Sequence, residues 1–147
     1  MRAHIAPILV TFALLASCIA VLAYALRPDM LFNFVHRAPG LWVAVMVLYP
    51  VLSVYPQGII FRAYFVHRFR PVFPRRNWMI LASATEFAFI HIIYRNPVAM
   101  VFSFAGGVLF TWRYYRTGSL LLSSFEHALY GCWMFTVGLG PYFYKGA

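Results

Sequence analysis

The segment Ile5–Leu26 reads "IAPILVTFALLASCIAVLAYAL" and contains no charged side chain. An apolar run of roughly 18 or more residues is long enough to cross about 30 Å of hydrocarbon as a helix. Inside a bilayer only helices and closed barrels satisfy every backbone hydrogen bond, and a run this continuous favours a helix. The segment therefore predicts a transmembrane helix near the amino terminus.

The remainder of the chain repeats this pattern. Of 147 residues, 63% are hydrophobic and only 10% are charged, whereas about a quarter are charged in an ordinary soluble domain. The predicted membrane segments are Ile5–Leu26, Pro39–Phe65, Trp78–Tyr94, Pro97–Tyr115 and Ser119–Leu139. We therefore expect an all-α, polytopic transmembrane bundle of about five helices, forming one integral-membrane domain over residues 1–147.

The first two segments contain sequence features that bear on helix shape and on processing. Pro50 and Pro56 lie inside the second one, which predicts a kinked or partly re-entrant helix. The first segment contains an "AYA" sequence typical of signal-peptide cleavage and an "LASC" sequence resembling a lipoprotein site. Its apolar stretch is longer than a signal core and continues past Cys18, so we expect a retained anchor. Cys18 and Cys132 both lie in apolar segments and predict no disulfide.

The charge pattern predicts partners and topology. There are 12 basic residues against 3 acidic ones, and most basic residues lie in short connections between apolar segments. This distribution favours the lipid bilayer and its headgroups as the partner, and excludes nucleic acid. One side collects Arg2, Arg68, Arg70, Arg75, Arg76, Arg113 and Arg116, and the other has Arg27, Arg37, Arg95 and Lys145. The positive-inside rule then predicts a cytoplasmic amino terminus in a multi-pass protein of the bacterial inner membrane.

Ionisable side chains inside membrane segments are costly and suggest function. Those in this chain are Arg62, Glu86, His91, Glu126 and His127, with Gln57 as a neutral companion. At about 1.5 Å per residue from the predicted cytoplasmic ends, Gln57 and Glu86 lie roughly 13 Å deep, His127 roughly 12 Å and His91 roughly 20 Å. Three helices thus bring polar groups to similar depths, which favours one wet cavity.

Structural roles for the same residues remain open alternatives. Either histidine could simply hydrogen-bond between helices, and Arg62 could snorkel to the headgroups. Glu86 could be a neutral buried acid, and Glu126 could pair with Arg62 or Arg113.

Helix geometry limits the pairings within one helix. Glu86 and His91 point about 140° apart, and Glu126 and His127 about 100° apart, so neighbouring residues must serve different partners.

Three motifs in order resemble those of the CPBP intramembrane proteases, which include the type II CAAX prenyl proteases. The motifs are "QGIIFR" at 57–62, "FAFIH" at 87–91 and "RTGSLLLSSFEHALYG" at 116–131. The family patterns are E-E-x-x-x-R, F-x-x-x-H, and H-x-x-x-N or a relative of it. The resemblance spans Tyr55–Gly131 and implies a catalytic site containing Arg62, His91 and His127, with Phe87, Gln57 and Tyr130 contacting substrate.

The chain departs from the family pattern at two places. Gln57 and Gly58 stand where the family has glutamates, and Gly131 stands where it has asparagine. In the family a glutamate is thought to activate the attacking water, so this carboxylate has been lost, replaced or moved. The candidates for a relocated base are Glu86 and Glu126. A His and Glu set would also suit zinc, but the spacing does not support a metal, and no cofactor is expected.

The resemblance implies an intramembrane endopeptidase, or a catalytically impaired relative, acting on membrane-embedded, lipid-adjacent or prenylated peptides. The alternative is a non-enzymatic scaffold or pseudoprotease that binds a client protein. A proton or ion pathway lined by the same residues is a third reading, because buried ionisable groups also mark such relays.

Overall fold

The computed structural model describes residues 2–144 of the chain, and the side chains of residues 4–144. Lys145, used above for the topology, lies outside the described residues. Every regular element within residues 2–144 is helical, which confirms the predicted all-α bundle. The α-helices are α1 (Arg2–Leu26), α2 (Asn33–Arg37), α3 (Pro39–Tyr49), α4 (Tyr55–Gly58), α5 (Phe65–Phe69), α6 (Arg76–Ile90), α7 (Pro97–Thr117) and α8 (Leu120–Thr136).

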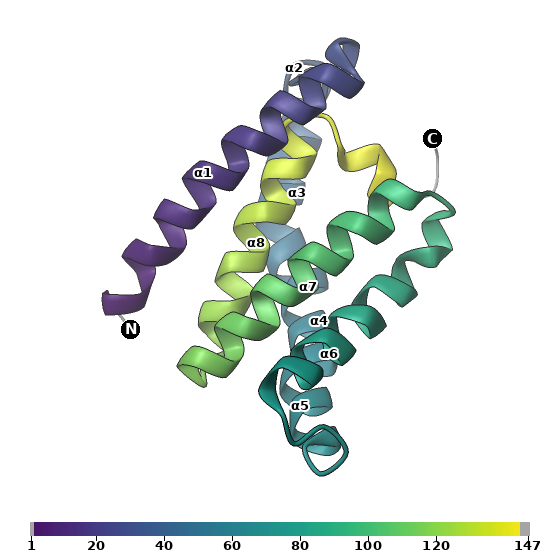
Figure 1. Cartoon of the computed structure of the whole chain (residues 1–147). Helices are drawn as coiled ribbons and strands as arrows, with labels where there is room; N and C mark the ends of the chain where they lie inside the picture. The colour runs from purple at the N-terminus through teal and green to yellow at the C-terminus, as the bar shows by residue number, and fades with distance from the viewer. Residues whose placement is uncertain (1, 145–147) are drawn as a thin grey trace.

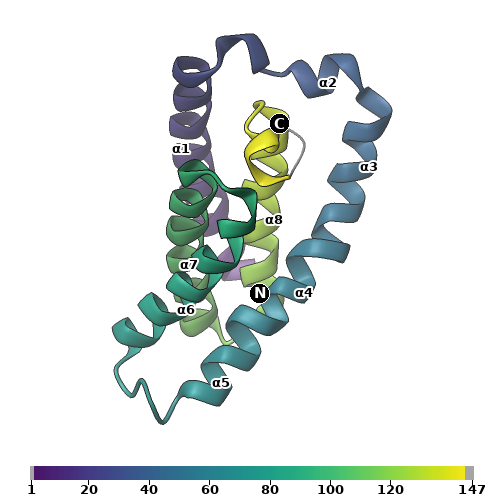
Figure 2. The same cartoon turned by 90° about the vertical axis from the view of Figure 1, so that its right-hand side faces the viewer.

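Helix α8 runs through the middle of the bundle (Figures 1 and 2). It contacts α1, α3, α4 and α7, whereas α6 packs mainly against α7. In Figure 2, α1 and α7 lie on one side of α8 and the α3–α5 helix on the other. Residues on α8 can therefore reach partners on most of the other helices.

Local sequence signals explain the turns around α7. The Asn96 side chain accepts a hydrogen bond from the Ala99 N–H at 2.8 Å, which caps the start of the helix ahead of Pro97. Gly118 ends the helix with φ of +63°, a left-handed conformation that glycine adopts without strain. Ser119 then caps α8 by accepting from the Leu122 N–H. These caps fold α7 and α8 into a tight hairpin.

Helices α3, α4 and α5 form one continuous helix, Pro39–Phe69, which extends past the predicted end at Phe65. It contains two π-helical turns, Pro50–Val54 and Ile59–Tyr64, near the two prolines at which a kink was predicted. The first begins at Pro50, which lacks the N–H that a regular α-helix would use. Wide turns of this kind are frequent at functional sites.

Side chains from two other helices hold the second π-helical turn. The Phe65 N–H bonds to the carbonyls of Ile60 and Arg62, and the Phe61 carbonyl accepts a 2.7 Å hydrogen bond from Ser83 Oγ of α6. Ser83 Oγ is also 2.9 Å from Thr111 Oγ1 of α7. The turn that carries Arg62 is therefore tied to both α6 and α7.

Two helices, His4–Leu26 and Pro39–Phe69, are long and apolar enough to cross a membrane. Large apolar side chains on both are exposed, such as Leu14 at 67% and Leu52 at 69%, as expected of surfaces that face lipid. The predicted segment Trp78–Tyr94 is shorter as an α-helix, because α6 ends at Ile90 and a 3-10 turn follows over His91–Tyr94. His91 thus lies at a helix end rather than within a helix.

Candidate active site

His91 and His127 line the same cavity, which has a volume of 360 Å³. Its wall is mostly apolar and comes from α1, α3, α6, α7, α8 and the turns at His91 and Gly140. Phe87 and Tyr130, two of the predicted substrate-contacting residues, also line it, whereas Gln57 does not. The structure therefore brings together the histidines of the second and third motifs.

His127 is enclosed by aromatic rings and faces Arg62. It is 5% exposed and stacks on Phe110 with ring centroids 4.6 Å apart, while the perpendicular Phe87 ring has its centroid 5.5 Å from that of His127. Its Nδ1 lies 3.4 Å from Nη2 of Arg62. A guanidinium can only donate hydrogen bonds, so Nδ1 must accept, and the proton of the neutral ring lies on Nε2.

His91 has the opposite arrangement. Its Nδ1 lies 2.6 Å from the carbonyl oxygen of Phe87, one helical turn earlier. A carbonyl can only accept, so Nδ1 carries the proton and Nε2 of the neutral ring keeps a free lone pair. One cavity is thus lined by a histidine that can accept a proton at Nε2 and by another that can donate a hydrogen bond from Nε2.

Arg62 is buried rather than directed to the headgroups. It is 1% exposed, and its guanidinium carbon lies 5.0 Å from the Phe87 ring centroid and 5.1 Å from that of Phe110. Its Nε and Nη1 atoms have no hydrogen-bond acceptor within residues 4–144. The aromatic faces and His127 position this cation, but no carboxylate of those residues neutralises it.

The first-motif positions lie beside Arg62 without supplying an acid. Gln57 donates a 2.7 Å hydrogen bond to Ser53 Oγ, one turn back on its own helix. Gly58 is buried, and a Cβ atom added there would lie 3.5 Å from Arg62 Nη1 and 2.8 Å from Ser124 Oγ. A glutamate at position 58 would lie within reach of Arg62 once the Ser124 side chain turns aside.

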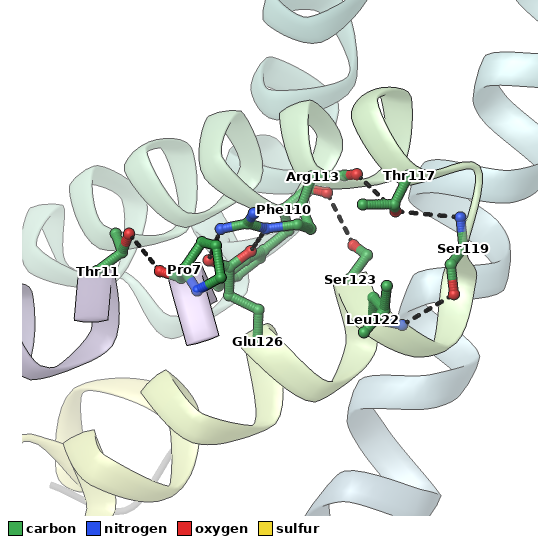
Figure 3. Close-up of polar contacts among 9 residues, drawn as sticks. All are labelled: Pro7, Thr11, Phe110, Arg113, Thr117, Ser119, Leu122, Ser123 and Glu126. Carbon is green, nitrogen blue, oxygen red and sulfur yellow. Dashed lines mark hydrogen bonds and ion pairs between the residues drawn. The ribbon is translucent and has the colours of Figure 1, made fainter. Parts of the chain in front are cut away.

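Glu126 is fully committed to Arg113. The two side chains form a bidentate pair between α7 and α8, with both N–O distances at 2.9 Å (Figure 3). Glu126 is 0% exposed, and both of its oxygens accept from Arg113. This arrangement is one of the two ion pairs predicted as structural alternatives.

Glu86 is only partly buried and forms no salt bridge within residues 4–144. Neither Glu86 nor Glu126 is among the side chains that line the cavity. The two carboxylates considered as a relocated base therefore do not meet the histidines.

Tyr49 is a site residue that the sequence did not indicate. It lines the cavity, its ring centroid lies 6.3 Å from that of His127, and its ring occupies the space into which a side chain at Gly131 would project. A Cβ at position 131 would approach Tyr49 Cζ to 2.7 Å. Where the resembled family has asparagine, this chain thus combines a glycine with a phenol from another helix.

Phe110 and Ser124 were also missed. Phe110 lies outside the three motifs, and Ser124 lies within the third motif but was not one of the residues singled out in it. An aromatic or serine residue in an apolar helix carries no sequence signal of its own, because the same residues occur in packing throughout membrane bundles.

The side chains present do not fit a zinc site. In the described part of the chain, no group of three or more His, Cys, Asp or Glu residues could hold a metal ion. His91 and His127 supply two ligands, whereas a catalytic zinc site uses three protein ligands.

The fold is thus a helical membrane bundle in which the two motif histidines line one apolar cavity. Comparison with protein families matches residues 38–133 to the family described as Type II CAAX prenyl endopeptidase Rce1-like. The chain belongs to this Rce1-like family, whose members are embedded in the membrane. The match begins just before α3 and ends within α8, and so includes Arg62, His91 and His127. Searches of curated proteins and of solved structures found no match.

Proposed function

We propose that this protein binds membrane-embedded or lipid-adjacent peptides in the 360 Å³ cavity and hydrolyses them slowly, as a catalytically impaired endopeptidase. The observation that carries the proposal is a pair of histidines on one cavity that no carboxylate of residues 4–144 lines. Nδ1 of His127 faces the Arg62 guanidinium, and Nδ1 of His91 faces a backbone carbonyl. Family membership supplies the reaction class.

The chemistry follows from the two rings. Hydrolysis requires a group that takes a proton from the attacking water and a donor that stabilises the oxyanion formed at the peptide carbonyl. His91 Nε2 can accept the proton of the water and later return it to the departing amine. His127 Nε2–H can donate to the oxyanion, and Arg62 holds its tautomer by donating to Nδ1. General-base groups typically contribute about 10² to 10⁴-fold, so a chain that relies on His91 in place of the family glutamate is expected to hydrolyse peptides slowly.

The cavity wall supports an apolar substrate. Leu15, Ile19 and Leu22 of α1 line one side, and the Tyr130 hydroxyl is buried with no hydrogen-bond partner among residues 4–144. An apolar peptide side chain or a prenyl group fits the first feature, and a peptide backbone group would satisfy the second. A membrane-embedded or prenylated peptide is therefore the partner class in this proposal.

The proposed topology places the amino terminus in the cytoplasm of a bacterial cell, with the protein in the inner membrane. The α5–α6 connection, which holds Arg70 and Arg75, and the α7–α8 turn after Arg116 lie at the same end of the bundle in both views. Basic residues gathered at one end support a cytoplasmic location for that end.

The test compares the native protein, Gly58→Glu and the neutral control Gly58→Gln in liposomes. Each is incubated with plain and prenylated membrane peptides, and products are identified by mass spectrometry. Slow cleavage by the native protein and by Gly58→Gln, with cleavage at least about 100-fold faster by Gly58→Glu, is the expected result. Equal rates in all three would show that no base is missing. An absence of cleavage by Gly58→Glu would remove the peptidase proposal and favour a non-enzymatic scaffold.

A further inference from the structure

We propose that Phe143 is a specificity-determining residue, whose ring leaves room only for a small substrate side chain beside the scissile bond. The inference rests on the proposed function and deepens it, since it takes His91 to lie at the scissile bond. Phe143 belongs to the 3-10 turn Gly140–Phe143, which lies beyond the family match over residues 38–133. Family membership therefore assigns this residue no role.

Phe143 is one of three aromatic rings around His91. The centroids of Phe87 and Tyr94, which belong to the same stretch of chain, lie 4.8 and 5.7 Å from that of His91. Phe143 comes from the turn after α8, and its ring stands at 76° to the imidazole with the centroids 6.2 Å apart. Both His91 and Phe143 line the cavity. A substitution at position 143 therefore changes the cavity wall next to His91 without altering the turn that carries His91.

The turn that carries Phe143 is fixed at both of its ends. The Asn96 side chain donates a 2.9 Å hydrogen bond to the carbonyl of Tyr142, the residue directly before Phe143. At the start of the turn, the Leu139 N–H donates a 2.9 Å hydrogen bond to the Met134 carbonyl, and the Leu139 side chain is 0% exposed. The Phe143 ring is therefore held in place, and a substrate has to fit around it.

The position of His91 determines which part of a substrate meets this ring. A general base has to lie within about 2.6–3.2 Å of the group whose proton it takes, or one water away. With His91 in that role, the substrate residues that flank the scissile bond lie beside His91 and hence beside Phe143. The 360 Å³ cavity has to hold the peptide backbone as well as these side chains. Because overpacking an apolar site is unfavourable, we expect glycine, alanine or serine next to the scissile bond and discrimination against phenylalanine.

Replacing Phe143 by alanine should reverse this discrimination. The substitution removes one phenyl group from the wall, and an apolar cavity of about 150 Å³ is large enough to bind benzene. A phenylalanine side chain of the substrate can then occupy the space that the Phe143 ring has left. Phe143→Leu leaves part of this space filled and should have an intermediate effect.

The experiment compares two membrane peptides with leucine flanks, one with a central stretch of alanines and one with a central stretch of phenylalanines. The second peptide offers no small side chain in any register. Binding to the purified full chain in liposomes is measured as competition with the photocrosslinking of an apolar peptide. Cleavage is measured as kcat/KM in the Gly58→Glu background. We expect the parent to favour the alanine peptide by about 10-fold or more in both readouts, and Phe143→Ala to reduce this preference to about 2-fold or less.

Phe102→Ala is the matched control. Phe102 also lines the cavity but forms no ring contact with His91 within residues 4–144, so its removal should leave the preference unchanged. Poor folding of a variant would weaken the binding of both peptides alike, whereas the ratio between them changes only when the size limit changes.

Equal binding of the two peptides by the native protein would overturn the inference. A preference that Phe143→Ala retains, or that Phe102→Ala loses to the same extent, would overturn it as well. These binding results do not depend on cleavage. If neither peptide is cleaved while Phe143→Ala abolishes the binding preference, the proposed hydrolysis fails and the size limit beside His91 stands as a property of binding.

Discussion

Glu126→Gln is expected to destabilise the protein strongly while leaving the chemistry of the cavity intact. The substitution leaves the buried Arg113 without its anion and weakens two charge-assisted hydrogen bonds of 2.9 Å. The side chains are 5% and 0% exposed, so water cannot replace the lost partner. Removing one member of such a pair costs about 3–5 kcal/mol. For a chain of this size that corresponds to a fall of roughly 10 °C in the unfolding midpoint.

The double variant Arg113→Met, Glu126→Leu tests the cause of this loss. It removes both charges and fills the space with apolar side chains, and such replacements are often neutral or stabilising. We therefore expect it to be at least about 2 kcal/mol more stable than Glu126→Gln alone. Glu86→Gln is the comparison variant, because Glu86 is only partly buried and forms no ion pair within residues 4–144, so removing its charge should destabilise the protein much less than Glu126→Gln does.

The assay is thermal unfolding in detergent followed by circular dichroism, combined with peptide cleavage in the Gly58→Glu background below the midpoint. Cleavage per folded molecule should be unchanged by Glu126→Gln. An unfolding midpoint of Glu126→Gln within 2 °C of the parent corresponds to a stability loss of about 1 kcal/mol or less. Such a result would refute the expectation that the buried ion pair is needed for stability. A folded Glu126→Gln protein that no longer cleaves would instead identify Glu126 as the base.

Three other changes probe the remaining geometry. His91→Gln in the Gly58→Glu background should lower kcat by about 10²-fold or more in the liposome assay, since it removes a proton acceptor from the cavity, and an unchanged kcat would exclude that role. Ser83→Ala should lower the free energy of unfolding by about 1–2 kcal/mol in a denaturant titration, because the π-helical turn loses its tie to α6; a loss below about 0.3 kcal/mol would contradict this. Labelling Cys18 with a bulky maleimide should block photocrosslinking of an apolar peptide, because Cys18 is exposed and lines the cavity, whereas Cys132 does not line it. Equal crosslinking before and after labelling, in a Cys132→Ala background, would show that peptides do not occupy this cavity.

The fold and the convergence of the two histidines were predictable from the sequence. Long uncharged segments determine helices in a bilayer, and the motifs place His91 on the third predicted membrane segment and His127 on the fifth. The depth calculation also suggested that Gln57 and Glu86 reach the same cavity, and neither lines it. Depth gives the height of a residue along a helix, but not the direction in which its side chain points, which depends on how each helix rotates against its neighbours.

Because sequence does not give side-chain directions, it could not determine the partner of Glu126 or the position of Tyr49. The sequence allowed Glu126 to pair with either Arg62 or Arg113. In the structure, the capped α7–α8 hairpin brings Glu126 against Arg113. Tyr49 could not be anticipated, because its place beside His127 depends on the missing side chain at Gly131, a steric relation between two helices. Sequence spacing describes one helix at a time, whereas these contacts arise from packing.

The π-helical turn Ile59–Tyr64 has a consequence for insertions and deletions in this chain. A π-helical turn contains more residues than an α-helical one, so deleting one residue within it can restore a regular α-helix with little disruption of the backbone. Each residue corresponds to about 100° of rotation, so a deletion after Arg62 would turn the part of the helix beyond the deletion relative to Arg62 and Gly58. A protein that remains folded would then present a different face of α5 to α6. Length variation at this turn offers a route by which related chains diverge in function while keeping the same bundle.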